Sequence, residues 1–326
     1  MTDRLAARYR RFAETEARGH SPLYEALAKG VAEDADVLRF LADLPPEKQQ
    51  PNLLLAAVRH ATGTPADWPA FRTALLAQPD AVRAIMLARA TQTNEPARCS
   101  VLLPVLAGLP GPLALLEVGA SAGLCLLPDR YGYDFGGRVL GAEAPVFQCR
   151  TNREAPAAIP EIAWRAGLDL NPIDPRDDEQ ARWLETLVWP DQPHRLANLR
   201  AALAVARADP PRVVWGDLRT DLEALAAAAP RTATLVVFHT AVLGYLADPE
   251  DRDAFAATVR RLGATWISNE VPGVFPDIAA KASTPRPHGT FLMAVDGEPV
   301  AWTDPHGAWI DWFGPHSQIH ASADTR

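Results

Sequence analysis

The sequence is poor in cysteine and contains no long hydrophobic run. Its three cysteines, Cys99, Cys125 and Cys149, form no CxxC pair, which argues against a disulfide framework and a thiolate zinc site. His316 and His320 have helical ligand spacing but no third ligand nearby, so we predict no metal. No stretch approaches the roughly 20 apolar residues that span a bilayer, and the first residues lack the apolar core of a secretory signal. We therefore expect a cytoplasmic protein without a membrane partner.

The sequence also lacks the excess of basic residues that would attract nucleic acid. The formal net charge is −8, with a balance of +1 in residues 1–110 and −9 in residues 111–326. An acidic second part repels polyanions, so we expect a small-molecule substrate and no nucleic-acid partner. The oligomeric state does not follow from these numbers.

The apolar pattern changes character near residue 110. Residues 1–110 show helical spacing throughout, with helix starts at Ser21-Pro22 and at Pro51, where a proline suits the first helical position. We predict an all-helical N-terminal domain over these residues. One interpretation of this domain is a lid over a site in the rest of the chain.

Residues 111–326 alternate short apolar runs with helical stretches. This alternation predicts an α/β domain with a doubly wound, mainly parallel, seven-stranded Rossmann-like sheet. Asp296-Gly297 predicts a closing antiparallel hairpin, and residues 125–165 look like a loop-rich insertion. The seven runs are Leu113–Val118, Gly167–Leu170, Arg212–Asp217, Thr234–His239, Thr265–Asn269, Thr290–Asp296 and Val300–Thr303.

The segment Leu113–Leu124 is the most informative in the chain. An apolar strand runs into the small residues Gly119, Ala120, Ser121 and Gly123, which let the backbone turn tightly and approach a ligand closely. An acidic residue, Glu117, lies two positions before the first glycine. The pattern predicts a nucleotide-type loop between a strand and a helix.

At these residues the sequence resembles class I S-adenosylmethionine-dependent methyltransferases, whose first motif Glu117, Gly119 and Gly123 match. The resemblance implies that the loop backbone lies against the methionine part of S-adenosylmethionine and that Glu117 organises its amino end. It also implies a ribose contact from Asp169, beside Leu170, and an adenine contact from Asp217 and Leu218. Asp169 and Asp217 each follow a predicted strand, but each is equally suited to capping a turn.

One spacing departs from the family pattern. Glu117 and Asp169 are 52 positions apart, whereas about 20 residues separate the corresponding positions in a dinucleotide-binding unit. Asp134 and Glu143 are therefore alternative ribose contacts. The other interpretation of the insertion is a substrate cap.

The candidate catalytic residues lie at the ends of the predicted fourth and fifth strands. His239 is the candidate general base, and Glu270 is a candidate catalytic group that would hold the acceptor. Asn269 is a candidate substrate contact. Asn94, Glu95 and Arg98 form a polar group before the α/β part, interpreted either as a helix start or as further substrate contacts.

Two other functions remain open. Gly119-Ala120-Ser121-Ala122-Gly123 is also a G-x-S-x-G sequence, which predicts a serine esterase with Ser121 as nucleophile. Its acid and histidine would be Asp217 with His239, or Asp248 with His288 or His306. The second alternative is a non-catalytic binding or scaffold protein of methyltransferase fold.

The chain as a whole is similar to an uncharacterised bacterial family known as a domain of unknown function. The likeness is carried by Gln92–Glu95, Gly119–Leu124, Glu161–Gly167, Leu187–Pro190 and Asp304–Gly307. It covers nearly the full length and implies no established activity.

Overall fold

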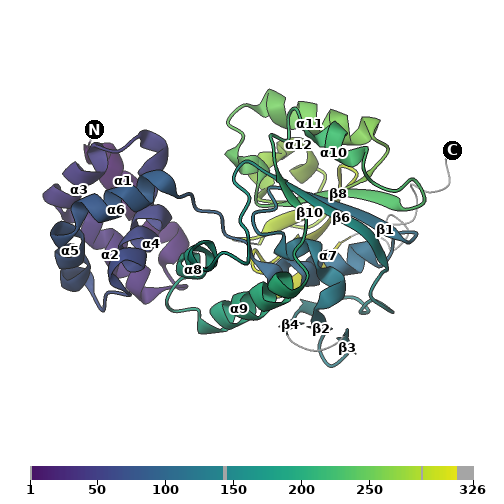
Figure 1. Ribbon diagram of the computed structural model, residues 1–326, viewed down its shortest axis with the longest axis horizontal. Coiled ribbons are helices and arrows are strands. Elements are labelled where there is room, and N and C mark those ends of the chain that lie inside the picture. Colours follow the sequence, from purple (N-terminus) through teal and green to yellow (C-terminus); the bar gives the residue numbers. More distant parts are fainter. Residues whose placement is uncertain (1, 142–144, 288, 314–326) are drawn as a thin grey trace. The chain divides into compact units, whose positions relative to one another are not determined.

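A computed structural model describes residues 2–141, 145–287 and 289–313. It is a mixed α/β protein with a large, mostly parallel central sheet and many helices (Figure 1). The chain divides into a helical unit, residues 1–93 with 178–197, and a sheet unit, residues 94–177 with 198–326. The sequence suggested one boundary at residue 110. The structure instead places residues 94–110 in the sheet unit and returns residues 178–197 to the helical unit.

The helical unit is built from short amphipathic helices, most of which start at a proline or after a capping side chain. Ser21 caps α2 by accepting from the backbone N–H of Tyr24 at 3.0 Å, and Asp67 caps α5 in the same way, as their residue types predict. The elements are α1 Thr2–Phe12, η1 Ala13–Ala17, α2 Pro22–Glu33, α3 Ala35–Ala42, η2 Pro46–Lys48, α4 Pro51–Thr62, α5 Trp68–Ala77, α6 Pro79–Ala88, α8 Asp178–Leu187 and the start of α9 Pro193–Ala208.

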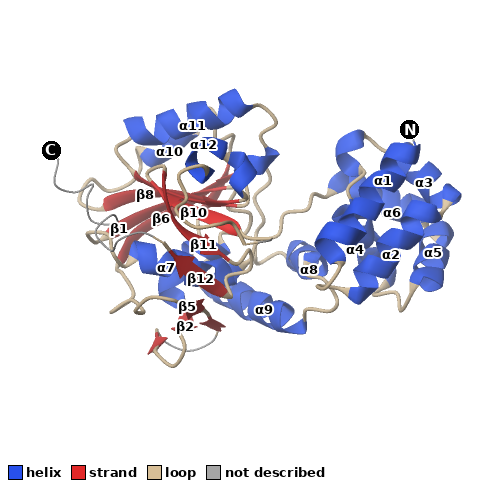
Figure 2. Ribbon diagram, turned by 180° about the vertical axis from the view of Figure 1, so that it is seen from behind, coloured by secondary structure: helices blue, strands red, loops and turns tan. Residues whose placement is uncertain are grey.

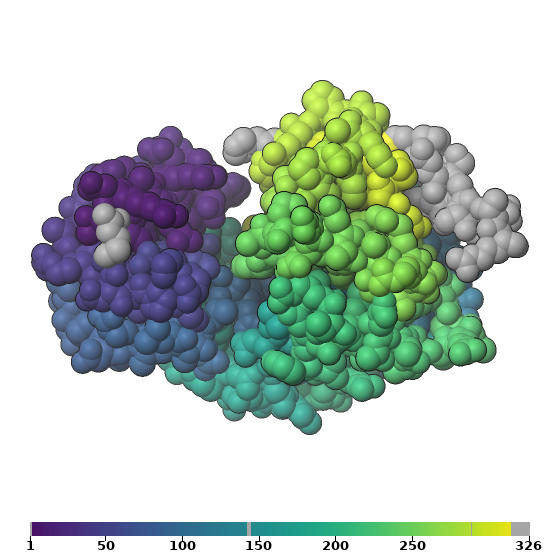
Figure 3. All heavy atoms as spheres, turned by 90° about the horizontal axis from the view of Figure 1, so that it is seen from above, coloured from purple at the N-terminus to yellow at the C-terminus, as the bar shows by residue number. Residues whose placement is uncertain are grey.

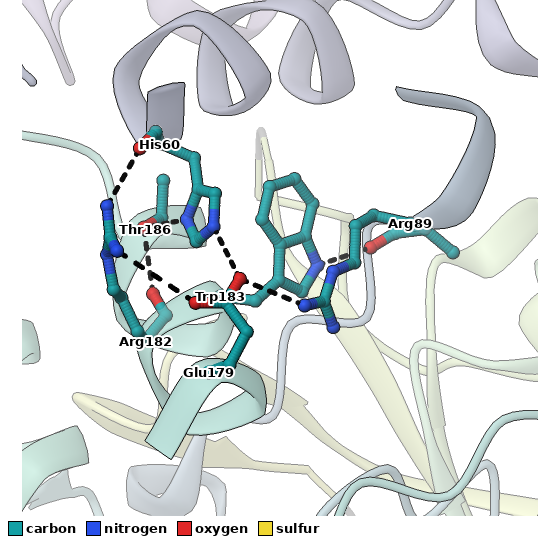
Figure 4. A network of polar contacts seen from close by, with 7 residues as sticks. His60, Arg89, Glu179, Arg182, Trp183 and Thr186 are labelled. Carbon is teal, nitrogen blue, oxygen red and sulfur yellow. Dashed lines mark hydrogen bonds and ion pairs between the residues drawn. The ribbon is translucent and has the colours of Figure 1, made fainter. Parts of the chain in front are cut away.

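Helix α8 joins the helical unit through a polar network around His60 (Figure 4). Nε2 of His60 lies 2.8 Å from Oε1 of Glu179, which also accepts from Arg89 at 3.1 Å. The buried Trp183 donates its indole N–H to the carbonyl of Ala90 at 2.9 Å. These contacts explain how a segment far along the chain belongs to this unit.

The main sheet of the other unit has the order β5-β12-β11-β10-β9-β8-β1-β6-β7. Strand β1 lies inside the sheet and pairs in parallel with both β6 and β8, so the strand order reverses between β1 and β8. Its strands are β1 Leu113–Val118, β5 Arg150–Thr151, β6 Ile162–Asp169, β7 Val213–Trp215, β8 Thr234–Thr240, β9 Thr265–Glu270, β10 Phe291–Val295, β11 Glu298–Thr303 and β12 Trp309–Trp312.

The described part of this sheet has nine strands, whereas the sequence predicted seven. All seven predicted runs form strands, and β10 and β11 form the expected antiparallel hairpin at Asp296-Gly297. The two additional strands are the short β5 and β12, which pair with each other at one edge. Two residues of β5 are too few to show a periodicity, which is why the sequence did not reveal it.

Alternation of side chains gives the sheet two differently covered faces. The first face carries Glu117, Thr240 and Asn269, and the second carries Val118 and His239. On the second face, residues of α10 Leu222–Ala226 and α11 Pro249–Arg261 complete a hydrophobic core with the strands. Figures 1 and 2 show α7 Cys99–Leu106 on the opposite side of the strands from α10 and α11. Figure 3 shows the protein from the side of α10 and α11. The later part of the sheet unit, coloured green to yellow, forms one continuous surface there.

The remaining elements are short. The insertion predicted at residues 125–165 contains a small three-stranded sheet in the order β3-β2-β4. No helix in the described part of the chain is long and apolar enough to cross a membrane. These short elements are η3 Pro96–Arg98, η4 Leu124–Leu126, η5 Pro128–Arg130, β2 Gly132–Asp134, β3 Val139–Leu140, β4 Val146–Gln148, η6 Leu243–Tyr245, η7 Pro272–Val274 and α12 Pro276–Ala279.

Candidate functional site

The loop after β1 has the sharp backbone turn that its glycines predict. Gly119, Ser121 and Gly123 have φ values of 69°, 53° and 70°, in the left-handed region where glycine is favoured and serine is uncommon. The chain continues into the 3₁₀ turn η4 rather than a long helix. Pro128 accounts for this early end, because proline cannot continue a helix from its interior.

Gly119 and Gly123 allow neighbouring side chains to pack closely against the backbone of the loop. A Cβ atom built on Gly119 would overlap both methyl groups of Val242, and one on Gly123 would lie 2.7 Å from Cγ of Pro211. The sequence interpretation attributed these glycines to close approach of a ligand. At both positions the structure assigns the space to neighbouring side chains instead.

The backbone N–H groups of this loop are largely used within the protein. Gly119 and Ala120 donate to the carbonyl of Leu168 at 2.8 and 3.3 Å, and Gly123 donates to the carbonyl of Ala120 at 2.7 Å. Ser121 donates to Oδ2 of Asp169 at 2.8 Å. A phosphate-binding loop needs such groups to be free for the anion, so this geometry argues against a pyrophosphate ligand.

Glu117 is a buried carboxyl group near the carboxyl end of β1. The residue is 2% exposed, and within the described part of the chain its Oε2 has no hydrogen-bond partner. Burial, assisted by nearby Cys125 and Asp169, raises the pKa of Glu117 well above its usual range, and Arg98 offsets part of that shift. A buried polar atom without a partner is costly, which makes Oε2 a candidate ligand contact.

The structure brings the polar group before the sheet against this loop. Oδ1 of Asn94 accepts from the backbone N–H of Leu124 at 3.0 Å. Arg98 donates to the carbonyl of Thr240 at 3.1 Å and to that of Pro305 at 2.8 Å. Glu95 caps the short helix η3 by accepting from the N–H of Ala97. Three predicted substrate residues therefore lie beside the carboxyl ends of β1 and β8.

Asn269 lies on the same face, on β9. It is fully buried, and its Oδ1 accepts from the hydroxyl of Thr303 at 2.7 Å. Its Nδ2 has no hydrogen-bond partner among the described residues. Among the described residues, the first face thus carries two buried polar atoms without hydrogen-bond partners, one on β1 and one on β9.

His239 and Glu270 lie together on the second face, away from Asn269. Nδ1 of His239 lies 2.7 Å from Oε1 of Glu270, and Nε2 accepts from the indole N–H of Trp266 at 3.0 Å. Oε1 of Glu270 also accepts from the backbone N–H groups of Val242 and Leu243, at 2.8 and 3.1 Å. Both nitrogens of a fully buried ring are occupied, so this arrangement supports a positioning role rather than proton transfer to a substrate.

A hollow lies beside Glu270 on the second face. The strand residues that line it alternate along β9 and β10, as expected for side chains on one face. It is lined by Ser268, Glu270, Val271, Pro272, Phe275, Ile278, Leu292 and Ala294. It is therefore separated by the sheet from Glu117.

The two candidate acids at the ends of β6 and β7 have different surroundings. Asp169 is half-buried, on the same face as Glu117, and accepts from the N–H groups of Ser121 and Asn171 at 2.8 and 2.7 Å. Asp217 is hydrogen-bonded to Arg219, which lowers the pKa of its carboxyl group. Asp169 is thus better placed to contact a ligand.

The hydrophobic neighbours of these acids also differ. Leu170 is 64% exposed, whereas Leu218 is half-buried and packs against the core of the second face. Among the alternative ribose contacts, Oδ1 of Asp134 accepts from the N–H of Gly137 at 2.7 Å in the insertion. Glu143 lies outside the described residues.

In the described part of the chain, the acids and histidines named for a serine esterase bind other partners. Asp217 binds Arg219, and His239 binds Glu270 and Trp266 on the second face. In the other set, Asp248 caps α11, and the backbone N–H of His306 donates to Asp304 at 2.8 Å. His288 lies outside the described residues.

His316 and His320 also lie outside the described residues. Among the residues that are described, no three histidine, cysteine, aspartate or glutamate side chains are grouped so as to hold a metal ion.

Sequence reasoning missed Thr240 and Thr303 as members of the site. Thr240 accepts from Arg98 and Thr303 donates to Asn269. The strand pattern contained a usable signal for Thr240. Neighbours in a strand point to opposite faces, so His239 and Thr240 cannot both face the loop after β1.

The chain belongs to the bacterial family described as "Uncharacterized protein conserved in bacteria (DUF2332)", which it matches over residues 6–312. No curated protein matches the chain significantly. Three segments that carry the family likeness meet in the sheet unit. Asn94 binds the loop Gly119–Leu124, and Ser100, just after the first segment, donates to the carbonyl of Gly307 at 2.7 Å.

Proposed function

We propose that the sheet unit is an S-adenosylmethionine-dependent methyltransferase acting on a small-molecule acceptor. The observation that carries the proposal is that Oε2 of Glu117 is buried and has no hydrogen-bond partner in the described part of the chain. It lies near the carboxyl end of β1, where the strand order reverses between β1 and β8. Ligands of doubly wound sheets bind at this point, outside the carboxyl ends of the strands.

The residues at this point fit the proposed cofactor better than they fit a dinucleotide. The cofactor's ammonium group is a donor that would satisfy Oε2 of Glu117. Asp169, on the next strand, accepts from two backbone N–H groups, which hold its carboxylate beside the loop, where it would accept from the ribose hydroxyls. S-adenosylmethionine carries no phosphate, which agrees with a loop whose N–H groups are already bonded.

Asp217 and Leu218 fit the cofactor less well than Glu117 and Asp169 do. Asp217 would have to accept from the base while remaining paired with Arg219, and Leu218 packs into the core. The proposal therefore places the ammonium and ribose contacts at Glu117 and Asp169 and assigns no adenine contact to Asp217.

When bound, the cofactor supplies a methyl group activated on a sulfonium sulfur, and the protein has to align it with the acceptor. Glu117 would hold the ammonium group of the cofactor, and Asp169 would hold its ribose. The proposed acceptor is a small molecule with a hydroxyl oxygen as its nucleophile. His239 is not included as its base, because both ring nitrogens are hydrogen-bonded within the protein.

Ligand-induced stabilisation tests the proposal. We expect S-adenosylhomocysteine at 100-fold over its Kd to raise the free energy of unfolding by about 2.7 kcal/mol, whereas NAD does not. Glu117→Gln should reduce this ligand-induced stabilisation. Glu223→Gln, at a side chain that is 56% exposed, should leave it unchanged. Absence of a shift with millimolar S-adenosylmethionine and S-adenosylhomocysteine would contradict the proposal.

Catalysis needs a separate measurement. Transfer of a labelled methyl group to low-mass compounds in a cell extract would support an enzyme. Binding without such transfer would favour the non-catalytic alternative. Labelling of Ser121 by a fluorophosphonate would favour the esterase.

A further inference from the structure

Arg98 is a buried cation that forms no ion pair with any residue that the structure describes. The residue is 7% exposed, and none of the ion pairs in the described part of the chain includes it. Its guanidinium donates to neutral oxygens, from Nε to the carbonyl of Pro305 and from Nη1 to the carbonyl and hydroxyl of Thr240. None of these bonds starts at Nη2. The guanidinium also lies over the ring of Phe291, with Cζ 5.6 Å from its centroid.

Buried charges in proteins are nearly always paired, because removing an ion from water is costly. Glu117 does not provide the missing partner. No ion pair joins it to Arg98, although the charge of Arg98 offsets part of the rise that burial causes in the pKa of Glu117. A guanidinium with free N–H groups matches the geometry of a carboxylate.

A second donor lies near Arg98 on the same face. Thr240, which Arg98 binds, is the register partner of Asn269 on the adjacent strand. Nδ2 of Asn269 is buried and has no partner among the described residues. The other amide atom, Oδ1, is fixed by Thr303 at 2.7 Å, which holds the amide in place.

We propose that Arg98 and Asn269 form a recognition site for the carboxylate group of a small molecule. The carboxylate would accept from Nη2 of Arg98 and from Nδ2 of Asn269. It would thereby satisfy a buried cation and a buried amide donor together.

The position of the site identifies the molecule as the methyl acceptor, and this assignment rests on the proposed function. The proposed cofactor contacts, Glu117 and Asp169, lie on β1 and β6. Asn269 lies on β9, which is separated from β1 by β8. The carboxylate site is therefore on the other side of the strand-order reversal from the ribose contact.

Calorimetric titration of the full chain with benzoate and with neutral benzamide tests the site directly. We expect benzoate to bind at least tenfold more tightly than benzamide. Arg98→Met should weaken benzoate binding at least tenfold and leave benzamide unchanged, whereas Arg98→Lys should retain part of the preference. The matched control is Arg150→Met, at a 66% exposed arginine that also lies over an aromatic ring. It should change neither affinity.

Asn269→Asp provides a second variant if Arg98→Met fails to fold. It keeps the shape of the side chain but removes the donor, so benzoate binding should again weaken at least tenfold. Equal affinity for benzoate and benzamide, or a preference for benzoate that survives in Arg98→Met or Asn269→Asp, would overturn the carboxylate site.

The source of the carboxylate is decided by comparing S-adenosylhomocysteine with 5′-methylthioadenosine, which lacks the amino-acid group. We expect Arg98→Met to leave the affinity of both unchanged. Tenfold weakening of S-adenosylhomocysteine alone would assign the carboxylate to the cofactor and overturn the acceptor assignment. Binding of benzoate without binding of either nucleoside would contradict the proposed function but leave the carboxylate site supported.

Discussion

Trp266 donates its indole N–H to Nε2 of His239 over 3.0 Å. An imidazole nitrogen that accepts a hydrogen bond carries no proton, so the ring proton lies on Nδ1 and is donated to Glu270. Glu270 in turn accepts from the backbone of Val242 and Leu243. This chain of bonds fixes the turn after β8, whose Val242 packs against Gly119.

We therefore expect His239→Ala to act mainly on stability. Removal of the ring leaves the indole N–H and one side of a buried carboxylate without partners, which should lower the free energy of unfolding by about 3 kcal/mol. Urea denaturation measures this value. His194→Ala, at an exposed histidine, is the control and should change stability by less than about 0.5 kcal/mol. Unchanged stability with complete loss of methyl transfer would instead support a catalytic base.

Glu117→Gln should change the pH dependence of stability. Burial raises the pKa of Glu117 in the folded state, so the folded protein retains a proton that the unfolded chain loses. Stability then falls as the pH rises from the unfolded pKa towards the raised folded pKa, at a rate of at most about 1.4 kcal/mol per pH unit.

Glutamine has no such proton, so the variant should gain stability relative to the wild type across this pH window. Urea denaturation at several pH values above 4.5 measures the difference. Because both proteins share every other titrating group, subtraction isolates residue 117. A difference that is independent of pH would show that Glu117 keeps its ordinary titration in the folded state.

Gly119→Ala should be strongly destabilising even without any ligand. The new methyl group would overlap Val242 at a backbone φ of 69°, and overpacking together with the strained φ should cost about 3 kcal/mol. Gly136→Ala is the matched control, because Gly136 has a φ of 76° with no atom within 4 Å. It should cost about 1 kcal/mol, the conformational part alone.

The double variant Gly119→Ala/Val242→Ala tests the cause. Removal of the valine methyl groups makes room for the alanine, so the double variant should cost at least about 1 kcal/mol less than the sum of the single variants. Strict additivity in urea denaturation would show that the contact with Val242 is not the origin of the effect.

Trp183→Ala should detach residues 178–197 from the rest of the helical unit. Trp183 is 1% exposed and is hydrogen-bonded to the carbonyl of Ala90, so truncation should cost about 3–5 kcal/mol. Limited proteolysis should then cleave within residues 178–197 faster than in the wild type. Trp215→Ala removes a tryptophan that is 75% exposed, and equal protease sensitivity of the two variants would contradict this role of Trp183.

Local signals determined much of this structure from sequence. Prolines and capping residues such as Ser21 and Asp67 set helix starts, because their effects act within one turn. Apolar runs gave the seven main strands, and Asp296-Gly297 gave the hairpin, since its positive φ values suit that turn. The sequence also indicated Glu117, Asp169 and Arg98 as site candidates, each at the end of a strand or beside the glycine-rich loop.

Tertiary structure decided which candidates meet. Strand pairing put Glu117, Thr240 and Asn269 on one face and His239 with Glu270 on the other, because register and pleat set the direction of each side chain. Packing of Val242 assigned a protein contact to Gly119, which no local pattern distinguishes from a ligand contact. The partnerless atoms of Glu117 and Asn269, and the unpaired charge of Arg98, became visible only once distant segments had folded together, because burial and hydrogen-bond partners are properties of the folded chain.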